Sequence, residues 1–182
     1  MRLNKVGFDK IGSYQKELKK YFVKKLSAIK DITITPLLTS HDATNPCGYM
    51  LDDGKERLVY MTDTGEFKQE NLAYCKNPDY LVLESNHDIQ MLMLTHRPQL
   101  LKDRIMSEHG HLCNEDSAYA ALDIIGDRTK AIYLAHLSEE ANTPEKALET
   151  YNDIFSRHSV NPDIKLVCLH QWHSTTGGNY EN

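Results

Sequence analysis

The segment RLVYMTDTG, residues 57–65, is the stretch around which the rest of the chain is organised. Its first half is a short run of apolar, β-branched and aromatic side chains, which is typical of a buried β-strand. The run ends in a polar turn that contains Asp63. Because α/β sheets place ligands beyond the carboxyl ends of their strands, Asp63 is a candidate functional residue. A plain β-turn is the alternative, since Asp, Thr and Gly are common turn formers.

Similar apolar runs alternate with segments of helical character, which predicts an α/β fold. The predicted strands cover residues 32–38, 48–51, 57–61, 80–83, 131–135 and 164–169. The second and third of them flank a turn at Asp52-Asp53-Gly54 and should form a β-hairpin. The predicted helices cover residues 69–74, 89–94, 98–107, 115–125 and 144–156. Asn114 is the expected N-cap of the fourth helix, and Thr143 is the expected N-cap of the fifth.

The totals are those of a soluble globular protein with one domain. The 182 residues are 26% charged and 40% hydrophobic, and a chain of this length can bury its own core. The net charge of −5 gives no overall basic field, so nucleic-acid binding would need a local basic patch. The four cysteines form no C-x-x-C pair, which predicts reduced thiols in the cytoplasm. No window has the roughly 18 apolar residues of a membrane span, so we expect no membrane association.

Four of the predicted strands are followed by side chains that can bind metal ions. These are His41-Asp42, Asp63, the segment Glu84–Asp88, and His136. In one sheet they should lie along a common edge, where two imidazoles and a carboxylate would suit Zn²⁺, Mn²⁺ or Fe²⁺. A carboxylate that bridges two ions about 3.5–4 Å apart would let one activate water while the other holds the leaving oxygen. The alternative is that these are ordinary polar turn residues at strand ends.

The segment His170-Gln171-Trp172-His173 contains a second histidine pair, spaced i,i+3. A metal site here would need a helix and further ligands. Neither is evident from the sequence, so a role in a tail or an edge strand is the favoured interpretation.

Five motifs together resemble the metallo-β-lactamase-fold hydrolases, and most closely the YycJ/WalJ-like subgroup. They are TPLLTSHDATNPCGY (35–49), TDTG (62–65), LVLESNHDIQML (81–92), LLKDRIMSEHGHLCN (100–114) and LAHLSEEANTPE (134–145). The resemblance runs in order from about residue 30 to residue 170. It implies the C-terminal half of an αββα sandwich, with a mixed sheet and flanking helices. The implied activity is exonucleolytic hydrolysis of phosphodiester bonds in DNA, although this fold also hosts hydrolysis of thioesters and lactams.

The resemblance also implies roles for individual side chains. His41, Asp63 and His136 match metal ligands, with Asp63 as the carboxylate that bridges two ions of Zn²⁺ or Mn²⁺. The implied catalytic residues, which would orient ligands or contact the scissile phosphate, are Glu84, Asn86, His87 and His111. Lys102 and Arg104 could contact backbone phosphates, but a solvated helix face is the favoured interpretation for both.

The chain departs from the family pattern at one important point. The His-x-His-x-Asp-His motif that supplies most of the metal ligands is absent from the sequence. The nearest match is His109-Gly110-His111, but Cys113 and Asn114 stand where Asp and His are required. Three remaining ligands would be divided between two ions, whereas a zinc site normally needs at least three protein ligands. We therefore expect weak or partial metal binding and little hydrolysis by this chain alone.

This absence leads to an expected domain organisation and to an alternative function. We expect an N-terminal remnant at residues 1–30, a partial metallo-β-lactamase-fold domain at 31–173 and a flexible tail at 174–182. The alternative function is that of an inactive truncated or split-gene product. Such a fragment would act only as a folding or association half, and its partner would be a chain that carries the missing histidines.

Overall fold

The computed structural model describes residues 32–173 and residue 175, in which six strands form one sheet. The strands, in spatial as well as chain order, are β1 (Thr33–Leu38), β2 (Cys47–Asp52), β3 (Arg57–Met61), β4 (Tyr80–Glu84), β5 (Ala131–Ala135) and β6 (Lys165–Cys168). β1, β2 and β3 pair in antiparallel fashion, whereas β3 to β6 are parallel. The predicted α/β fold with a mixed sheet is confirmed. The predictions for residues 1–30, 174 and 176–182 lie outside the described residues.

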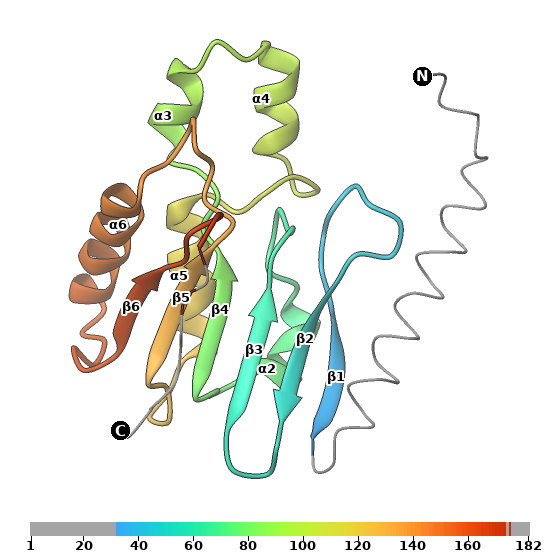
Figure 1. Ribbon diagram of the computed structural model, residues 1–182, viewed down its shortest axis with the longest axis vertical. Coiled ribbons are helices and arrows are strands. Elements are labelled where there is room, and N and C mark those ends of the chain that lie inside the picture. Colours follow the sequence, from blue (N-terminus) through green and yellow to red (C-terminus); the bar gives the residue numbers. More distant parts are fainter. Residues whose placement is uncertain (1–31, 174, 176–182) are drawn as a thin grey trace.

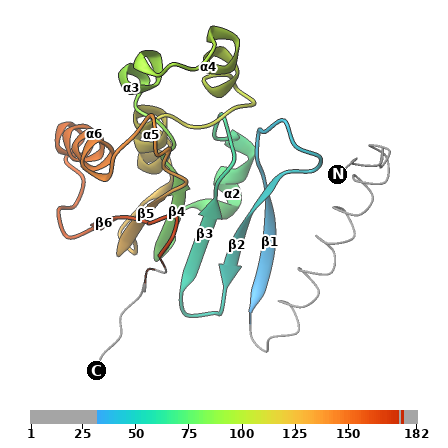
Figure 2. The ribbon, with the colours of Figure 1, turned by 45° about the horizontal axis from the view of Figure 1, so that its top comes forward.

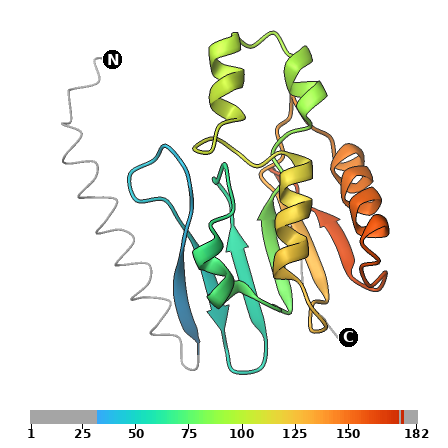
Figure 3. The ribbon, with the colours of Figure 1, turned by 180° about the vertical axis from the view of Figure 1, so that it is seen from behind.

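The helices cover one face of this sheet and the end at which its parallel strands finish. α2 (Leu72–Cys75), α5 (Asn114–Ile124) and α6 (Pro144–Arg157) lie on the same face, as Figure 3 shows from behind. α3 (Ile89–Leu94) and α4 (Gln99–Ile105) stand beyond the edge at which the parallel strands end (Figure 1 and Figure 2). A short 3-10 helix, η1 (Gln69–Asn71), precedes α2. No helix among the described residues is long and apolar enough to span a membrane.

The main core lies between the sheet and α5 and α6. Alternate residues of β3 show how the sequence divides between the two faces, because successive side chains of a strand point to opposite sides. Val59 and Met61 are fully buried in the core, whereas Tyr60 between them is 43% exposed on the other face. β4 and β5 continue the same row with buried leucine and isoleucine side chains. The apolar run of residues 57–61 therefore forms a central strand, as predicted.

The start of α5 differs from the prediction by one residue. The N-cap is Cys113, whose Sγ accepts a hydrogen bond from the Asp116 amide, and Asn114 is the first helical residue. The Asn114 side chain is buried and is used elsewhere: its Oδ1 accepts from Ser85 Oγ at 2.6 Å, and its amide pairs with Asn142. The Asn114 side chain therefore takes part in a tertiary hydrogen-bond network and does not cap the helix as local capping preference had predicted. Thr143 caps α6 as predicted.

A charge cluster around Asp79 stabilises the opposite end of the sheet, where β4 begins. Asp79 is 4% exposed, and its carboxylate accepts hydrogen bonds from the Arg57 amide at 2.9 Å and from Arg128 at 2.7 Å. Lys130 Nζ lies 3.1 Å from its other oxygen. Burial alone would raise the pKa of the Asp79 carboxyl, but hydrogen bonds from Arg57, Lys130 and Arg128 outweigh burial and hold the pKa below its usual value.

The change Asp79→Asn should therefore lower the free energy of unfolding at neutral pH by about 2 kcal/mol, the usual value for hydrogen bonds to a charged group. Because the pKa of Asp79 is lower in the folded state, its contribution is complete above the unfolded pKa of about 3.9. It is lost as the pH falls through the lower folded pKa. Urea unfolding at about pH 7 and about pH 2.5 checks this. The difference between the parent and the variant should be smaller at the lower pH, and a constant difference would refute the role given to Asp79.

Candidate metal centre

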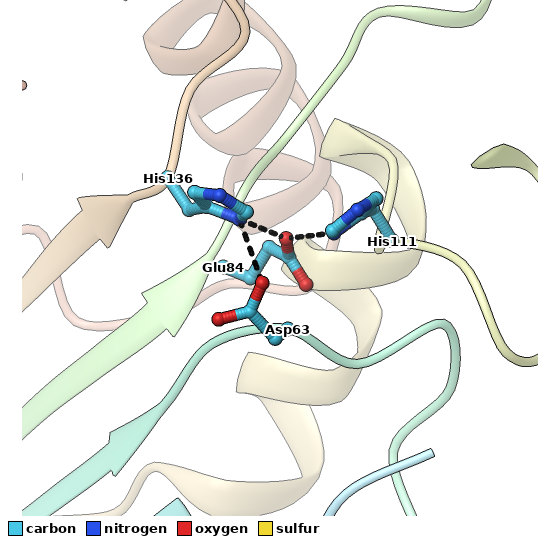
Figure 4. Close-up of side chains that lie close together, drawn as sticks. All are labelled: Asp63, Glu84, His111 and His136. Carbon is cyan, nitrogen blue, oxygen red and sulfur yellow. Dashed lines mark hydrogen bonds and ion pairs between the residues drawn. The ribbon is translucent and has the colours of Figure 1, made fainter. Parts of the chain in front are cut away.

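Five candidate side chains meet at the edge where the parallel strands end. Asp63 follows β3, Glu84 is the last residue of β4 and His136 follows β5. His111 comes from the loop between α4 and α5 (Figure 4). His41 follows β1, which runs parallel to β3 because both are antiparallel to β2. The topology therefore places residues from distant parts of the chain along one edge.

The distances among these groups are those of a compact site. Asp63, Glu84, His111 and His136 each offer one ligand atom within 4.8 Å of all the others. This is the one group of three or more possible metal ligands in the part of the chain that the structure describes. His41 lies beside it, with its Nε2 4.0 Å from Asp63 Oδ1 and its ring 4.9 Å from that of His111.

Glu84 is fully buried and holds two of the imidazoles. Its Oε1 accepts hydrogen bonds from His111 Nδ1 at 2.7 Å and from His136 Nδ1 at 2.6 Å, and its Oε2 accepts from the Thr64 amide at 2.8 Å. A carboxylate only accepts hydrogen bonds, so both rings must carry their proton on Nδ1. Burial would raise the pKa of Glu84, but the hydrogen bonds from the two histidines outweigh it and lower the pKa.

The same contact changes the titration of His136. The hydrogen bond to Glu84 raises the pKa of His136 above its usual value, although burial of the ring opposes this. The negative charge of Asp63, whose Oδ1 is 3.7 Å from His136 Nδ1, acts in the same direction as Glu84. The edge of the sheet thus carries two acidic groups that favour a positive charge between them.

His41 is oriented for ligand binding by a backbone carbonyl. Its Nδ1 lies 3.0 Å from the Gly110 oxygen, which can only accept, so Nδ1 is protonated and Nε2, which faces Asp63, is the nitrogen available to an ion. This is the usual arrangement of a metal-binding histidine, with a carbonyl on its other nitrogen. Gly110 is required at this turn because a Cβ there would collide with the carbonyl oxygens of Arg104 and Ile105.

These residues fit a divalent ion. Imidazole nitrogen and carboxylate oxygen are the donors that Zn²⁺, Mn²⁺ and Fe²⁺ accept. Two ligands of one ion, each about 2.1 Å from it, lie at most about 4.2 Å apart. Asp63 Oδ1 is within that range of His41 Nε2, at 4.0 Å. It also lies 3.7 Å from His136 Nδ1, but that nitrogen donates its proton to Glu84, so His136 would bind an ion through Nε2. The carboxylate therefore lies between the imidazoles of His41 and His136.

The other predicted site residues lie in different surroundings. Asn86 lines the cleft above the site and donates a hydrogen bond to the His136 carbonyl at 2.8 Å. His87 is 1% exposed and does not line the cleft, and burial followed by the nearby His111 lowers its pKa to about 4. Its predicted catalytic role stays a prediction. Lys102 is buried and donates to the Met93 carbonyl at 2.6 Å, whereas Arg104 lines the cleft and pairs with Asp42.

Two parts of the site were not predicted from the sequence. Thr64 is fully buried, donates its amide to Glu84 and accepts from the Ser40 amide, so it joins the TDTG turn to the segment that carries His41. Residues 169–173 line the same cleft of about 1060 Å³ as Asp63 and His136, although the pattern of residues 170–173 favoured a tail or an edge strand. The one available signal was the combination of a tryptophan with two histidines at the end of a predicted strand.

The backbone is strained at two of the candidate ligands. Asp63 and His136 have φ values of 57° and 58°, in the left-handed region that side chains other than glycine seldom adopt. Both residues follow a strand at the same edge of the sheet. Strain of this kind persists where the surrounding structure imposes it, and it is concentrated at functional sites.

The change Asp63→Gly should therefore be more stable to unfolding than Asp63→Ala, by about 1 kcal/mol, because glycine adopts a positive φ without strain. The matched control is Tyr60, three residues earlier and within β3. There the order should reverse, with glycine about 0.5–1 kcal/mol less stable than alanine. Thermal or urea unfolding of the four variants measures both differences, and the same order at both positions would contradict the assignment of strain to Asp63.

Comparison with known proteins supports the fold and the resemblance. The family described as "Beta-lactamase superfamily domain" matches residues 20–137. The exodeoxyribonuclease YycJ of Bacillus anthracis is 43% identical over 117 residues, which are 64% of this chain and 44% of that protein. The exodeoxyribonuclease WalJ of Streptococcus pneumoniae serotype 2 (strain D39 / NCTC 7466) is 38% identical over 138 residues, which are 76% of this chain and 51% of that protein. The chain thus spans about half the length of the curated relatives it matches.

A solved structure agrees with the fold. The metallo-β-lactamase fold protein YhfI from Bacillus subtilis superimposes with a TM-score of 0.54 over 76% of this chain and 47% of that one. The two sequences are 19% identical. The predicted resemblance is confirmed: this chain belongs to the β-lactamase superfamily domain family and is a YycJ/WalJ-like protein of the metallo-β-lactamase fold.

Proposed function

We propose that this chain forms part of a metal-dependent hydrolase that cleaves phosphodiester bonds in DNA with two ions of Zn²⁺ or Mn²⁺. The observation that carries the proposal is the Asp63 carboxylate between His41 and His136, with 4.0 Å and 3.7 Å to their nitrogens. The site opens into a cleft large enough for a nucleotide. The choice of DNA is supported by the two relatives, which are both exodeoxyribonucleases.

The residues of the site would share the chemistry as follows. His41, Asp63 and His136 would hold the ions. A bound divalent ion supplies a water of lowered pKa and neutralises charge on a phosphate. Glu84 keeps the Nδ1 proton of His111 in place, so that His111 can exchange a proton with a substrate oxygen through Nε2. Asn86, on the wall of the cleft, would orient the substrate.

The described residues alone would leave the site short of ligands. With Glu84 and His111 in other roles, three ligand side chains remain for two ions, whereas zinc sites normally have at least three protein ligands each. The whole 182-residue sequence contains no His-x-His-x-Asp-His motif. We therefore propose that the remaining ligands come from a polypeptide segment outside this sequence, on a partner chain or on the same gene product. The four cysteines are all free, which supports the cytoplasm as the place of action.

The ligand shortage also favours one alternative function, that of a non-catalytic association half. The two functions differ in what a complementing polypeptide would do. If the chain is part of an enzyme, adding a polypeptide with the histidine motif should produce metal-dependent release of nucleotides from single-stranded DNA. Association without any such release would favour the alternative.

Metal titration of the 182-residue chain tests the ligand assignment. We expect fewer than two equivalents of Zn²⁺ or Mn²⁺, weakly bound, by isothermal titration calorimetry. Asp63→Ala should reduce the affinity by more than about 100-fold, since even partners that only orient a ligand contribute about 10–100-fold. His96→Ala is the matched control because His96 is exposed and does not line the cleft. Two tightly bound equivalents would contradict the incomplete site, and unchanged binding in Asp63→Ala would contradict its bridging role.

A further inference from the structure

The segment that follows β6 brings an aromatic side chain to the cleft of the metal centre. Leu169 is held beside β5 by a hydrogen bond from its amide to the Leu134 carbonyl at 2.8 Å. The chain then runs along the cleft, and Trp172 lines the same cavity as Asp63 and His136. Trp172 is 75% exposed and is the one tryptophan of the sequence. A large apolar ring is thus presented to the solvent next to the candidate metal ligands.

The indole ring is anchored by its edge. Its Nε1 donates a hydrogen bond to Glu139 Oε1 at 2.7 Å, and Glu139 lies on the loop that also carries His136. An edge contact of this kind fixes the ring and leaves most of its surface accessible, in agreement with the high exposure. The same segment adds two imidazoles, those of His170 and His173, whose ring centroids are 6.3 Å apart. Both histidines also line the cleft.

The cleft combines these rings with cationic side chains. Arg97 and Arg104 line it, and each forms an ion pair with an acidic neighbour, Glu140 and Asp42 respectively. Aromatic rings that stack on bases and cations that contact the backbone are the two elements of single-strand binding sites. In a duplex the faces of internal bases are already stacked, so an exposed ring selects unpaired bases.

We infer that Trp172 is a stacking platform for an unpaired nucleobase, and that the cleft accepts the single-stranded end of a nucleic acid. The inference rests on the proposed function, because it gives the form of the substrate that reaches the same site. Stacking on an aromatic side chain is tolerant of sequence, since every base has a π-face. The platform therefore predicts binding that depends on the presence of a base and little on its identity.

The single tryptophan makes the test direct. The probe is an oligothymidylate of about eight nucleotides, within the usual site size, added to the 182-residue chain with a chelator to prevent hydrolysis. The comparison probe is an abasic oligomer of the same length and charge. Emission of Trp172 should be quenched by the first probe and much less by the second. The base-bearing probe should bind about tenfold more tightly, as one stacked base implies.

Variants separate stacking from a structural role. Trp172→Ala should weaken binding of a labelled oligothymidylate by about tenfold in fluorescence anisotropy and remove the preference over the abasic probe. Trp172→Phe should keep most of that preference. Tyr119→Ala is the control, because Tyr119 is also a solvent-exposed aromatic residue, at 49%, but lies on α5 and does not line the cleft. It should bind as the parent does.

Several outcomes would overturn the inference: no binding of either probe, equal binding of both, or a Trp172→Ala variant that binds like the parent. A failure of the proposed function would look different. Base-dependent quenching that persists when no metal-dependent hydrolysis can be obtained with a complementing polypeptide would leave the stacking platform intact and refute the enzyme. Conversely, metal-dependent hydrolysis that Trp172→Ala leaves unchanged, together with equal binding of both probes, would refute the stacking platform and support the enzyme.

Discussion

The buried carboxylate of Glu84 is the constraint on which the candidate site depends. It accepts hydrogen bonds from two imidazoles that lie 27 and 52 residues away in the sequence, and from the amide of Thr64. Removing a carboxylate from water costs several kcal/mol, and three hydrogen bonds to a charged group, each contributing about 1.5–3 kcal/mol, can offset that cost. His111, His136 and the TDTG turn are held together by this one side chain, which itself touches no solvent.

Buried polar residues next to Glu84 connect the end of β4 to α5 and α6 by hydrogen bonds. The Glu84 carbonyl accepts a hydrogen bond from Ser117 of α5, whose hydroxyl also contacts the buried Tyr151 hydroxyl of α6 at 2.6 Å. Ser85 contacts Asn114 at the start of α5, and Asn142, just before α6, joins both. A buried network with satisfied partners fixes relative positions more specifically than apolar packing does. These hydrogen bonds therefore hold the end of β4 rigidly against α5 and α6. Such rigid surroundings are what the strained backbone of Asp63 and His136 requires.

The parts of the structure that depend on local pattern could be predicted from the sequence. The strand at 57–61 and the helix at 144–156 follow from periodicity and capping, and Asp63 and His136 follow from their place after buried strands. The pairing of Glu84 with His111 could not be derived from spacing, because the loop before α5 brings His111 back by tertiary contacts alone. Tertiary contacts also explain why the prediction of Asn114 as an N-cap was wrong, because its side-chain amide is used in the buried hydrogen-bond network. They likewise explain why the position of Trp172 could not be predicted, since nothing in the local pattern of residues 170–173 indicates which wall the chain approaches after β6.

The central claim is that this edge of the sheet holds a divalent ion at Asp63, between His41 and His136. Anomalous X-ray diffraction from crystals of the chain grown with zinc or manganese tests it most directly. The predicted result is an anomalous peak about 2.0–2.2 Å from an Asp63 carboxylate oxygen, with an imidazole nitrogen of His41 or His136 at a similar distance. An ion bound only elsewhere, for example between His170 and His173, with no peak at Asp63, would contradict the account.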